Sequence, residues 1–378
     1  MKRLFKMTAL FMLAILIMLI LVVTLYVNFA PQFGAVATGE RLKRMQHSPN
    51  YKEGAFQNLV ETTLDLSLKT NLKTGWKMIQ GTVDAEPKDT IQTVPFDARL
   101  FQGTGSPDEV AVSWFGHSSL LIRIQGKTLL TDPVFSERAS IVSFAGPKRF
   151  LYNHYFDVDE LPPVDAVVMS HDHYDHLDYQ TFVRLKDKVA RFFVPLGVGA
   201  HLEKWGIAPD RITELDWWES AQLDDLTLVC TPARHFSGRG LFTNRNGTLW
   251  ASWALLGTKK RVYYGGDSGY QPAFKAIGEK YGPFDLAMLE CGAYNEGWAS
   301  IHMMPEETAQ AQIDVKANVL MPIHWGKFNL ALHTWRDPIQ RLMKKSAELG
   351  TQVATPRIGE VLVLERPVST TRWWESYP

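Results

Sequence analysis

The chain has 378 residues with 40 basic and 40 acidic side chains, so it carries no net formal charge. That balance argues against a nucleic-acid enzyme, which needs a basic surface, and the length suits one large domain or two small ones. Two cysteines are too few for a disulfide framework. Cys230 and Cys291 lie in apolar, strand-like runs and are predicted to be core residues.

The N-terminal run of residues 7–29 is uncharged and almost entirely apolar, and it is long enough to cross a bilayer as a helix. Lys2, Arg3 and Lys6 precede it. The positive-inside rule therefore makes residues 1–30 a cytoplasmic N-terminus and single-pass membrane anchor, with the rest of the chain on the outer, periplasmic or extracytoplasmic side. The alternative is a signal peptide cleaved near residues 35–37, which would leave a secreted or periplasmic protein. We favour the uncleaved anchor because the apolar run exceeds the usual signal-peptide core.

Residues 31–105 are predicted to form an extension packed on a main domain of residues 106–378. Within the extension, residues 41–66 are expected to form helices, and the polar stretch 71–93, which contains Gly75, Gly81 and Pro87, reads as a loop or arm. The main domain begins with three apolar runs separated by short turns, at 110–115, 119–124 and 128–133. This spacing predicts an antiparallel meander.

Beyond residue 160, predicted strands and helices alternate. The expected strands are 166–169, 190–194, 226–230, a hairpin over 250–264, 285–289, 319–323 and 361–364. The expected helices are 178–186, 198–205, one that starts at Pro305, and 337–349, which Gly350 ends. Two sheets packed face to face with helices outside would satisfy this α/β pattern, although the pattern alone leaves other α/β arrangements open.

A dense cluster of metal-binding side chains directly follows the apolar run 166–169. Within residues 170–178 (SHDHYDHLD), His171 and His173 alternate, and Asp175 and His176 follow. Imidazole and carboxylate are the ligands that suit catalytic zinc. The alternative is a solvated polar loop. We favour a metal site because so many ligating side chains gather at the end of one strand.

Three more metal-capable residues each lie just past a predicted strand: His235, Asp267 and His324. Taken singly, they could be a capped loop histidine, a turn former beside glycines and a core histidine. Their shared placement, together with the cluster at 170–178, instead predicts a site with two metal ions.

These motifs resemble the metallo-β-lactamase superfamily, and within it the branch of N-acylphosphatidylethanolamine-hydrolysing phospholipase D and its bacterial relatives. The matching segments are 114–119 (WFGHSS), 131–136 (TDPVFS), 145–149 (AGPKR), 302–307 (HMMPEE) and 322–326 (PIHWG). The resemblance covers residues 105 to 365 and implies a four-layer αββα sandwich. It also implies that His171, His173 and His235 hold one metal, that Asp175, His176 and His324 hold the other, and that Asp267 bridges them.

Further residues are candidates for substrate contact or catalysis. Asp172 is expected to order the attacking water or a ligand histidine, unless it only stabilises its loop. His302 precedes the helix that starts at Pro305 and is expected to contact a phosphate or donate a proton, unless it caps that helix. His117 is expected to support the site, and Tyr294 and Asn295 to line its pocket.

The resulting expectation is a zinc-dependent hydrolase in which two divalent ions generate a hydroxide near neutral pH. Its substrate would be N-acylphosphatidylethanolamine or a related membrane phospholipid. Alternatives are hydrolysis of a carboxylic ester, lactone or amide at the same site, and, less favoured, a di-iron redox protein or a non-catalytic metal-binding envelope protein. The branch motifs argue against β-lactam hydrolysis.

Overall fold

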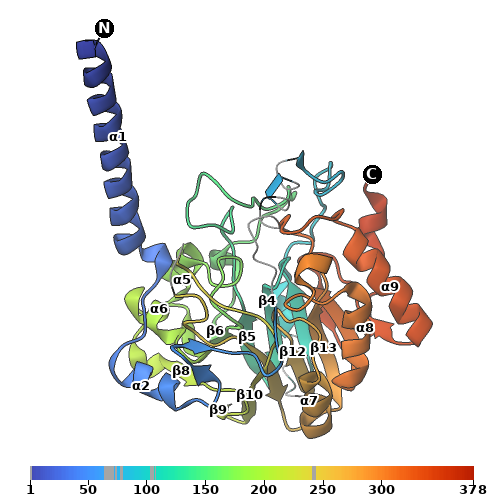
Figure 1. Ribbon diagram of the computed structural model, residues 1–378. Coiled ribbons are helices and arrows are strands. Elements are labelled where there is room, and N and C mark those ends of the chain that lie inside the picture. The colour runs from blue at the N-terminus through green and yellow to red at the C-terminus, as the bar shows by residue number, and fades with distance from the viewer. Residues whose placement is uncertain are drawn as a thin grey trace.

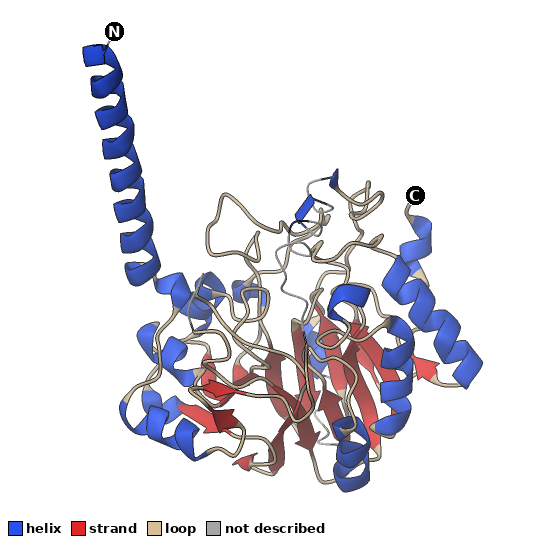
Figure 2. Ribbon diagram, viewed as in Figure 1, coloured by secondary structure: helices blue, strands red, loops and turns tan. Residues whose placement is uncertain are grey.

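The structure is a computed structural model, and it describes residues 2–63, 72, 75–76, 80–102, 106, 108–240 and 244–378. Two seven-stranded sheets pack face to face with helices on both outer sides (Figures 1 and 2). This is the predicted four-layer αββα arrangement.

The first sheet is built from the N-terminal half of the domain together with the C-terminal edge strand β16, in the order β16-β3-β4-β5-β6-β7-β8. Its strands are β3 (Ala111–Trp114), β4 (Leu120–Ile124), β5 (Lys127–Thr131), β6 (Val164–Val168), β7 (Val189–Pro195), β8 (Ile212–Leu215) and β16 (Val361–Val363). Strands β3, β4 and β5 pair antiparallel, as the meander prediction required, and β5 to β8 pair parallel. The edge strand β8 was not predicted.

The second sheet repeats this plan in the order β15-β14-β13-β12-β11-β10-β9. Its strands are β9 (Ser220–Leu223), β10 (Leu226–Pro232), β11 (Ala251–Leu256), β12 (Arg261–Tyr264), β13 (Phe284–Glu290), β14 (Ala317–Ile323) and β15 (Gln352–Val353). The predicted hairpin over 250–264 is confirmed by the antiparallel pair β11 and β12. Strands β12 to β15 pair parallel. The last five residues of β14 are all buried, because a parallel strand covered on both faces needs a continuous apolar run.

Helices cover the outer face of each sheet (Figure 1). On the first sheet these are α5 (Tyr179–Leu185) and α6 (Gly199–Lys204), and on the second α7 (Ala273–Tyr281), α8 (Pro305–Asp314) and α9 (Asp337–Leu349). A short helix, α4 (Ala98–Gln102), contacts β3. Gly350 ends α9 in the left-handed conformation, with φ of 68°, which a residue with a Cβ adopts only at a cost.

Helix α1 (Lys2–Phe29) projects away from the sandwich (Figure 1). Within the described residues, one helical segment, Arg3–Phe29, is long and apolar enough to cross a membrane, with mean hydropathy 3.1. The segment that follows, residues 31–35, is tied to α6 and to the residue that ends it: the Trp205 indole donates to the Pro31 carbonyl at 2.8 Å, and Ala35 N donates to His201 Nδ1 at 2.9 Å.

The extension differs in part from its prediction. Helix α2 (Gly39–His47) forms, but the helical prediction for residues 48–63 is wrong. Pro49 follows the helix end, and Gly54 at φ 83° turns the chain into a hairpin of β1 (Tyr51–Lys52) and β2 (Ala55–Phe56). Burial of Phe56 in the core outweighs local helix propensity. Residues 64–66 lie outside the described residues.

The expected arm at 71–93 is described only at residues 72, 75–76 and 80–93. Residues 72, 75, 76 and 80 are helical, so the prediction of a loop is wrong there. From residue 81 to 93 the segment has no helix, and it packs on the main domain through Ile91, which is buried and bridges to Tyr152. That part agrees with the prediction of an arm lying over the domain.

Candidate metal centre

The seven predicted ligands come together from the ends of four strands. Residues 171–176 follow β6, and His235, Asp267 and His324 follow β10, β12 and β14. Asp267 comes close to the ligands after β6 because the preceding residue, Gly266 at φ 57°, has no Cβ. A Cβ atom at that position would lie 2.6 Å from the Ser170 Cβ. His324 itself has a positive φ of 63°, and its amide donates to the His117 carbonyl at 2.9 Å. Strain of this kind is common at functional sites.

The first group of ligands consists of His171, His173 and His235. His173 Nδ1 lies 2.8 Å from His171 Nε2 and 3.3 Å from His235 Nε2. The outer nitrogen of His235, Nδ1, is 2.9 Å from the Ile301 carbonyl and donates to it. That bond leaves the lone pair on Nε2, facing the other two rings, as in metal-bound histidines.

The second group consists of His117, Asp175, His176 and His324. Asp175 Oδ2 lies 3.0 Å from His117 Nε2, 3.5 Å from His176 Nε2 and 3.6 Å from His324 Nε2. His117, expected only to support the site, therefore faces the ligands directly.

Asp267 lies between the two groups. Its Oδ2 atom is 2.8 Å from His324 Nε2 and 3.1 Å from His176 Nε2, both in the second group. The same oxygen is 3.9 Å from His171 Nε2 and 3.9 Å from His235 Nε2, both in the first group. One carboxylate thus reaches both groups, as a bridging ligand must.

The donor atoms fit divalent metal ions. Among the described residues, the buried atom Asp267 Oδ1 has no hydrogen-bond partner, and His176 Nε2 and His324 Nε2 approach Asp267 Oδ2 without the geometry of a hydrogen bond. Leaving a buried polar atom unpaired costs about 1–3 kcal/mol, and metal coordination would remove that cost. Imidazole nitrogen and carboxylate oxygen atoms, gathered here in sets of three and four possible ligands, suit zinc and related ions.

Burial sets the protonation of the first group. Burial, and then the neighbouring His176, lower the pKa of His171 well below its usual value. Burial and then His302 do the same for the pKa of His235, so both rings are neutral, the form that binds metal. Burial alone would also lower the pKa of His324, but Asp267 raises it to about 10. A metal ion would displace that proton.

Three residues that sequence reasoning missed contact the candidate site residues. Asp132 is fully buried, and its Oδ2 accepts from His176 Nδ1 at 2.6 Å and from the Tyr264 hydroxyl at 2.6 Å. Glu290 Oε2 lies 2.6 Å from His302 Nδ1. His201 Nε2 lies 3.2 Å from Asp172 Oδ2. Asp132 and Glu290 stand where their strands β5 and β13 end, the same placement that identified His324.

The remaining candidates lie in different surroundings. The Asp172 carboxylate accepts from Gly238 N at 2.8 Å and from the Thr248 hydroxyl at 3.0 Å, so it faces the loop after β10. The His302 ring centroid lies 5.0 Å from that of His235 and 5.3 Å from that of His324. Tyr294 and Asn295 line a separate cavity of about 510 Å³ whose described lining includes no candidate ligand.

Comparison with known proteins agrees with the fold. The family model described as a beta-lactamase superfamily domain matches residues 127–325. An uncharacterised protein of Mycobacterium tuberculosis is 46% identical over 334 residues, which are 87% of this chain and 88% of that protein.

N-acyl-phosphatidylethanolamine-hydrolyzing phospholipase D 1 of Caenorhabditis elegans is 38% identical over 266 residues, which are 66% of this chain and 74% of the relative. Among solved structures, a metallo hydrolase of Ignicoccus hospitalis matches with a TM-score of 0.54 at 22% identity, covering 68% of this chain and 100% of that one. The chain therefore belongs to the beta-lactamase superfamily, in which it is a metal-dependent hydrolase with the metallo-β-lactamase fold.

Proposed function

We propose that this protein is a phosphodiesterase of the phospholipase D type that acts on N-acylphosphatidylethanolamine or a related membrane phospholipid. The observation that carries the proposal is the 38% identity to the worm phospholipase, which extends over 66% of the chain. The grouped donor atoms support it, because two ions held a few ångströms apart suit displacement at phosphorus.

In this proposal two zinc ions occupy the centre. His171, His173 and His235 would hold one, Asp175, His176 and His324 would hold the other, and Asp267 lies within reach of both groups. When bound, such ions lower the pKa of a coordinated water and neutralise charge on a phosphoryl oxygen. Asp132 orients His176 by accepting from its Nδ1 atom.

We assign His302 to the substrate. Its Nδ1 atom is engaged with Glu290 at 2.6 Å, so Nε2 is the ring nitrogen that can contact the phosphate or give a proton to the leaving alcohol. Asp172 is assigned to positioning rather than chemistry. Its carboxylate joins the loop that carries His171 and His173 to Gly238 and Thr248.

Residues 1–30 are proposed as an uncleaved membrane anchor and residues 31–105 as an extension of the catalytic domain, residues 106–378. Contacts of the extension support this division. Asn58 Nδ2 donates to the His235 carbonyl at 2.8 Å, and Asn58 Oδ1 accepts from His235 N at 3.1 Å, so the extension holds a ligand in place. The rest of the chain would lie on the outer side of the membrane.

The test uses the full chain, purified in detergent and loaded with zinc. Given N-acylphosphatidylethanolamine, it should add water across the phosphodiester and release phosphatidic acid and an N-acylethanolamine in equal amounts. His324→Ala and Asp267→Asn should lose both metal and turnover, while His154→Ala, at a histidine paired with Glu160 away from the centre, should keep both.

Retained turnover in His324→Ala and Asp267→Asn would contradict the assignment of the site. Absence of phosphatidic acid across a phospholipid panel would contradict the lipid substrate. Turnover of a simple ester, lactone or amide in that case would establish the alternative hydrolase reaction at the same residues.

A further inference from the structure

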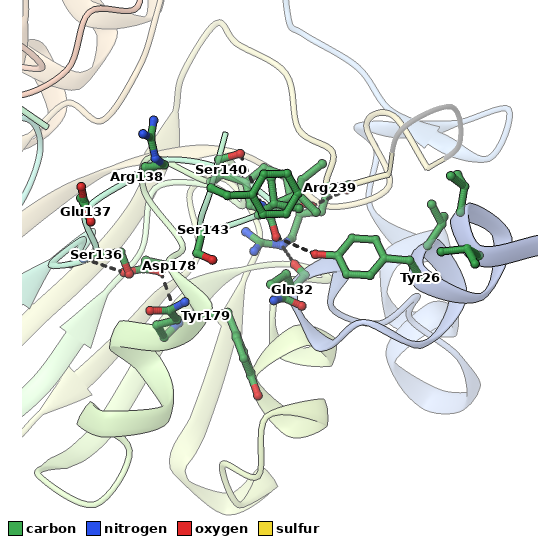
Figure 3. A pocket seen from close by; sticks show the side chains of 18 residues that line it. Tyr26, Gln32, Ser136, Glu137, Arg138, Ser140, Ser143, Asp178, Tyr179 and Arg239 are labelled. Atoms are coloured by element: carbon green, nitrogen blue, oxygen red, sulfur yellow. Dashed lines mark hydrogen bonds between the residues drawn. The ribbon is translucent and has the colours of Figure 1, made fainter. Parts of the chain in front are cut away.

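A cavity of about 590 Å³ lies between the C-terminal end of α1 and the loop of residues 136–144 (Figure 3). Tyr26 reaches from α1 to this loop, and its hydroxyl donates to the Ile141 carbonyl at 3.0 Å. The size is typical of a small-molecule site. None of the seven proposed metal ligands lines the cavity, so it is distinct from the metal centre.

The polarity of the cavity changes along its length. Val22, Val23 and Val27, which line the cavity, belong to the proposed membrane span, whereas the polar lining residues Gln32 and Arg239 belong to segments outside α1. A phospholipid that lies parallel to α1 has the same polarity, with acyl chains inside the bilayer and phosphate at its surface. Phe144, at the rim of the cavity, is 81% exposed, as suits a side chain that enters the interface.

Arg239 places a buried guanidinium group in the polar part of the lining. Its side chain is only 2% exposed. Nε donates to the Gln32 carbonyl at 2.9 Å, and Nη1 donates to the Asp172 and Leu177 carbonyls, each at 2.7 Å. Among the described residues, no atom accepts a hydrogen bond from Nη2. A buried charged donor without a partner is costly, and guanidinium groups are well suited to phosphate.

We propose that this cavity holds one glycerophospholipid of the surrounding bilayer, with its phosphate on Arg239 and an acyl chain along Val22, Val23 and Val27. The lining carries both signs of charge, with Arg138 and Arg239 against Glu137 and Asp178, so the phosphate is recognised locally rather than by a large positive field. This lipid is bound and not hydrolysed, and its site does not depend on the proposed phospholipase activity.

The same arginine also supports the metal loop. By holding the Asp172 and Leu177 carbonyls, it closes the loop that carries His173, Asp175 and His176. Substitution of Arg239 can therefore disturb the metal centre as well as the lipid site. A second variant has to block the apolar end of the cavity without touching that loop.

The experiment titrates the full chain, stripped of lipid in detergent micelles, with phosphatidylglycerol, and counts bound lipid by native mass spectrometry. Three variants are compared: Arg239→Gln, Val23→Trp, which fills the cavity, and Leu25→Trp as the matched control. Val23 and Leu25 are 46% and 47% exposed on the same helix, but only Val23 lines the cavity. Diacylglycerol and inorganic phosphate serve as separate probes, and metal content is measured throughout.

We expect one retained phosphatidylglycerol per chain. The affinity for this lipid should fall at least about tenfold, which corresponds to about 1.4 kcal/mol, in Val23→Trp and in Arg239→Gln. In Leu25→Trp the affinity should be unchanged. Unchanged metal content in Val23→Trp would separate this loss from damage to the metal centre. Equal retention by Val23→Trp and the parent chain would overturn the proposal. So would equal binding of diacylglycerol, which lacks the phosphate, or full displacement of the lipid by inorganic phosphate.

Discussion

Asp132→Asn tests whether the buried carboxylate behind His176 controls metal binding. Four donors converge on this side chain. Ser170 N donates to Oδ1 at 2.8 Å, and His176 Nδ1, the Tyr264 hydroxyl and the Ser170 hydroxyl all donate to Oδ2. The substitution keeps the shape of the side chain but replaces one acceptor with an NH2 group and removes the negative charge.

The expected loss of stability follows from the two orientations that the new amide at position 132 can take. With its nitrogen in the Oδ1 position, one donor loses its acceptor; with its nitrogen in the Oδ2 position, three do. The first orientation costs less, so the free energy of unfolding of the metal-free protein should fall by about 1–3 kcal/mol. His176 then faces a neutral oxygen, its Nε2 atom becomes less basic, and metal affinity should fall about 10–100-fold.

The assay is a titration of the metal-free protein with zinc against a competing chelator, together with denaturant unfolding of the same samples. Asp165→Asn is the control, because Asp165 accepts from Thr128 N at 2.8 Å at the opposite end of β6. It should lose stability without losing metal affinity. If Asp132→Asn folds and binds zinc as tightly as the parent chain, the supporting role of this carboxylate is refuted.

Three further predictions follow from the same geometry. His302→Gln should lower turnover about 10²–10⁴-fold while zinc content, measured by plasma mass spectrometry, stays at the parent value; loss of zinc would make His302 a ligand instead. Burial, and then Arg149, lower the pKa of Lys327 to about 7, from an ordinary 10.5. Between pH 7 and 10.5 the unfolded chain therefore binds a proton that the native protein does not. The free energy of unfolding of the parent, relative to that of Lys327→Met, should rise with pH by up to about 1.4 kcal/mol per pH unit. Unfolding titrations in which this difference in free energy stays flat or falls from about pH 7 to 10 would contradict the prediction. The parent chain should resist alkaline extraction from membranes. The double variant Leu16→Arg/Leu19→Arg should be extracted, because two charges in α1 oppose its insertion into the bilayer. Extraction of the parent chain would rule out a spanning anchor.

Local sequence was enough to locate most of the centre. Parallel strands that are covered on both faces must be apolar along their length, so a histidine or aspartate directly after such a run stands out. His235, Asp267 and His324 were found by this rule, and the structure brings them to the cluster at 171–176. The anchor-like helix followed from apolar length alone.

Other features depend on contacts between distant parts of the chain. The helical prediction for residues 48–63 failed because Phe56 is buried in the core of a domain that begins far along the chain. Asn58 meets His235, and Arg239 meets Gln32, across separations of 177 and 207 residues. No local pattern marks such partners.

The sequence by itself therefore determined which residues could bind metal, which strands present them and where a membrane helix could form, since these depend on side-chain chemistry and on periodicity within a few residues. Tertiary structure alone decided that one oxygen of Asp267 reaches both ligand groups, that Asp132 and Glu290 stand behind histidines, and that α1 closes a cavity against Arg239. These relations are set by how two sheets pack and where each loop crosses their edge, because hydrogen bonds and coordination act over a few ångströms in space, whatever the separation in sequence.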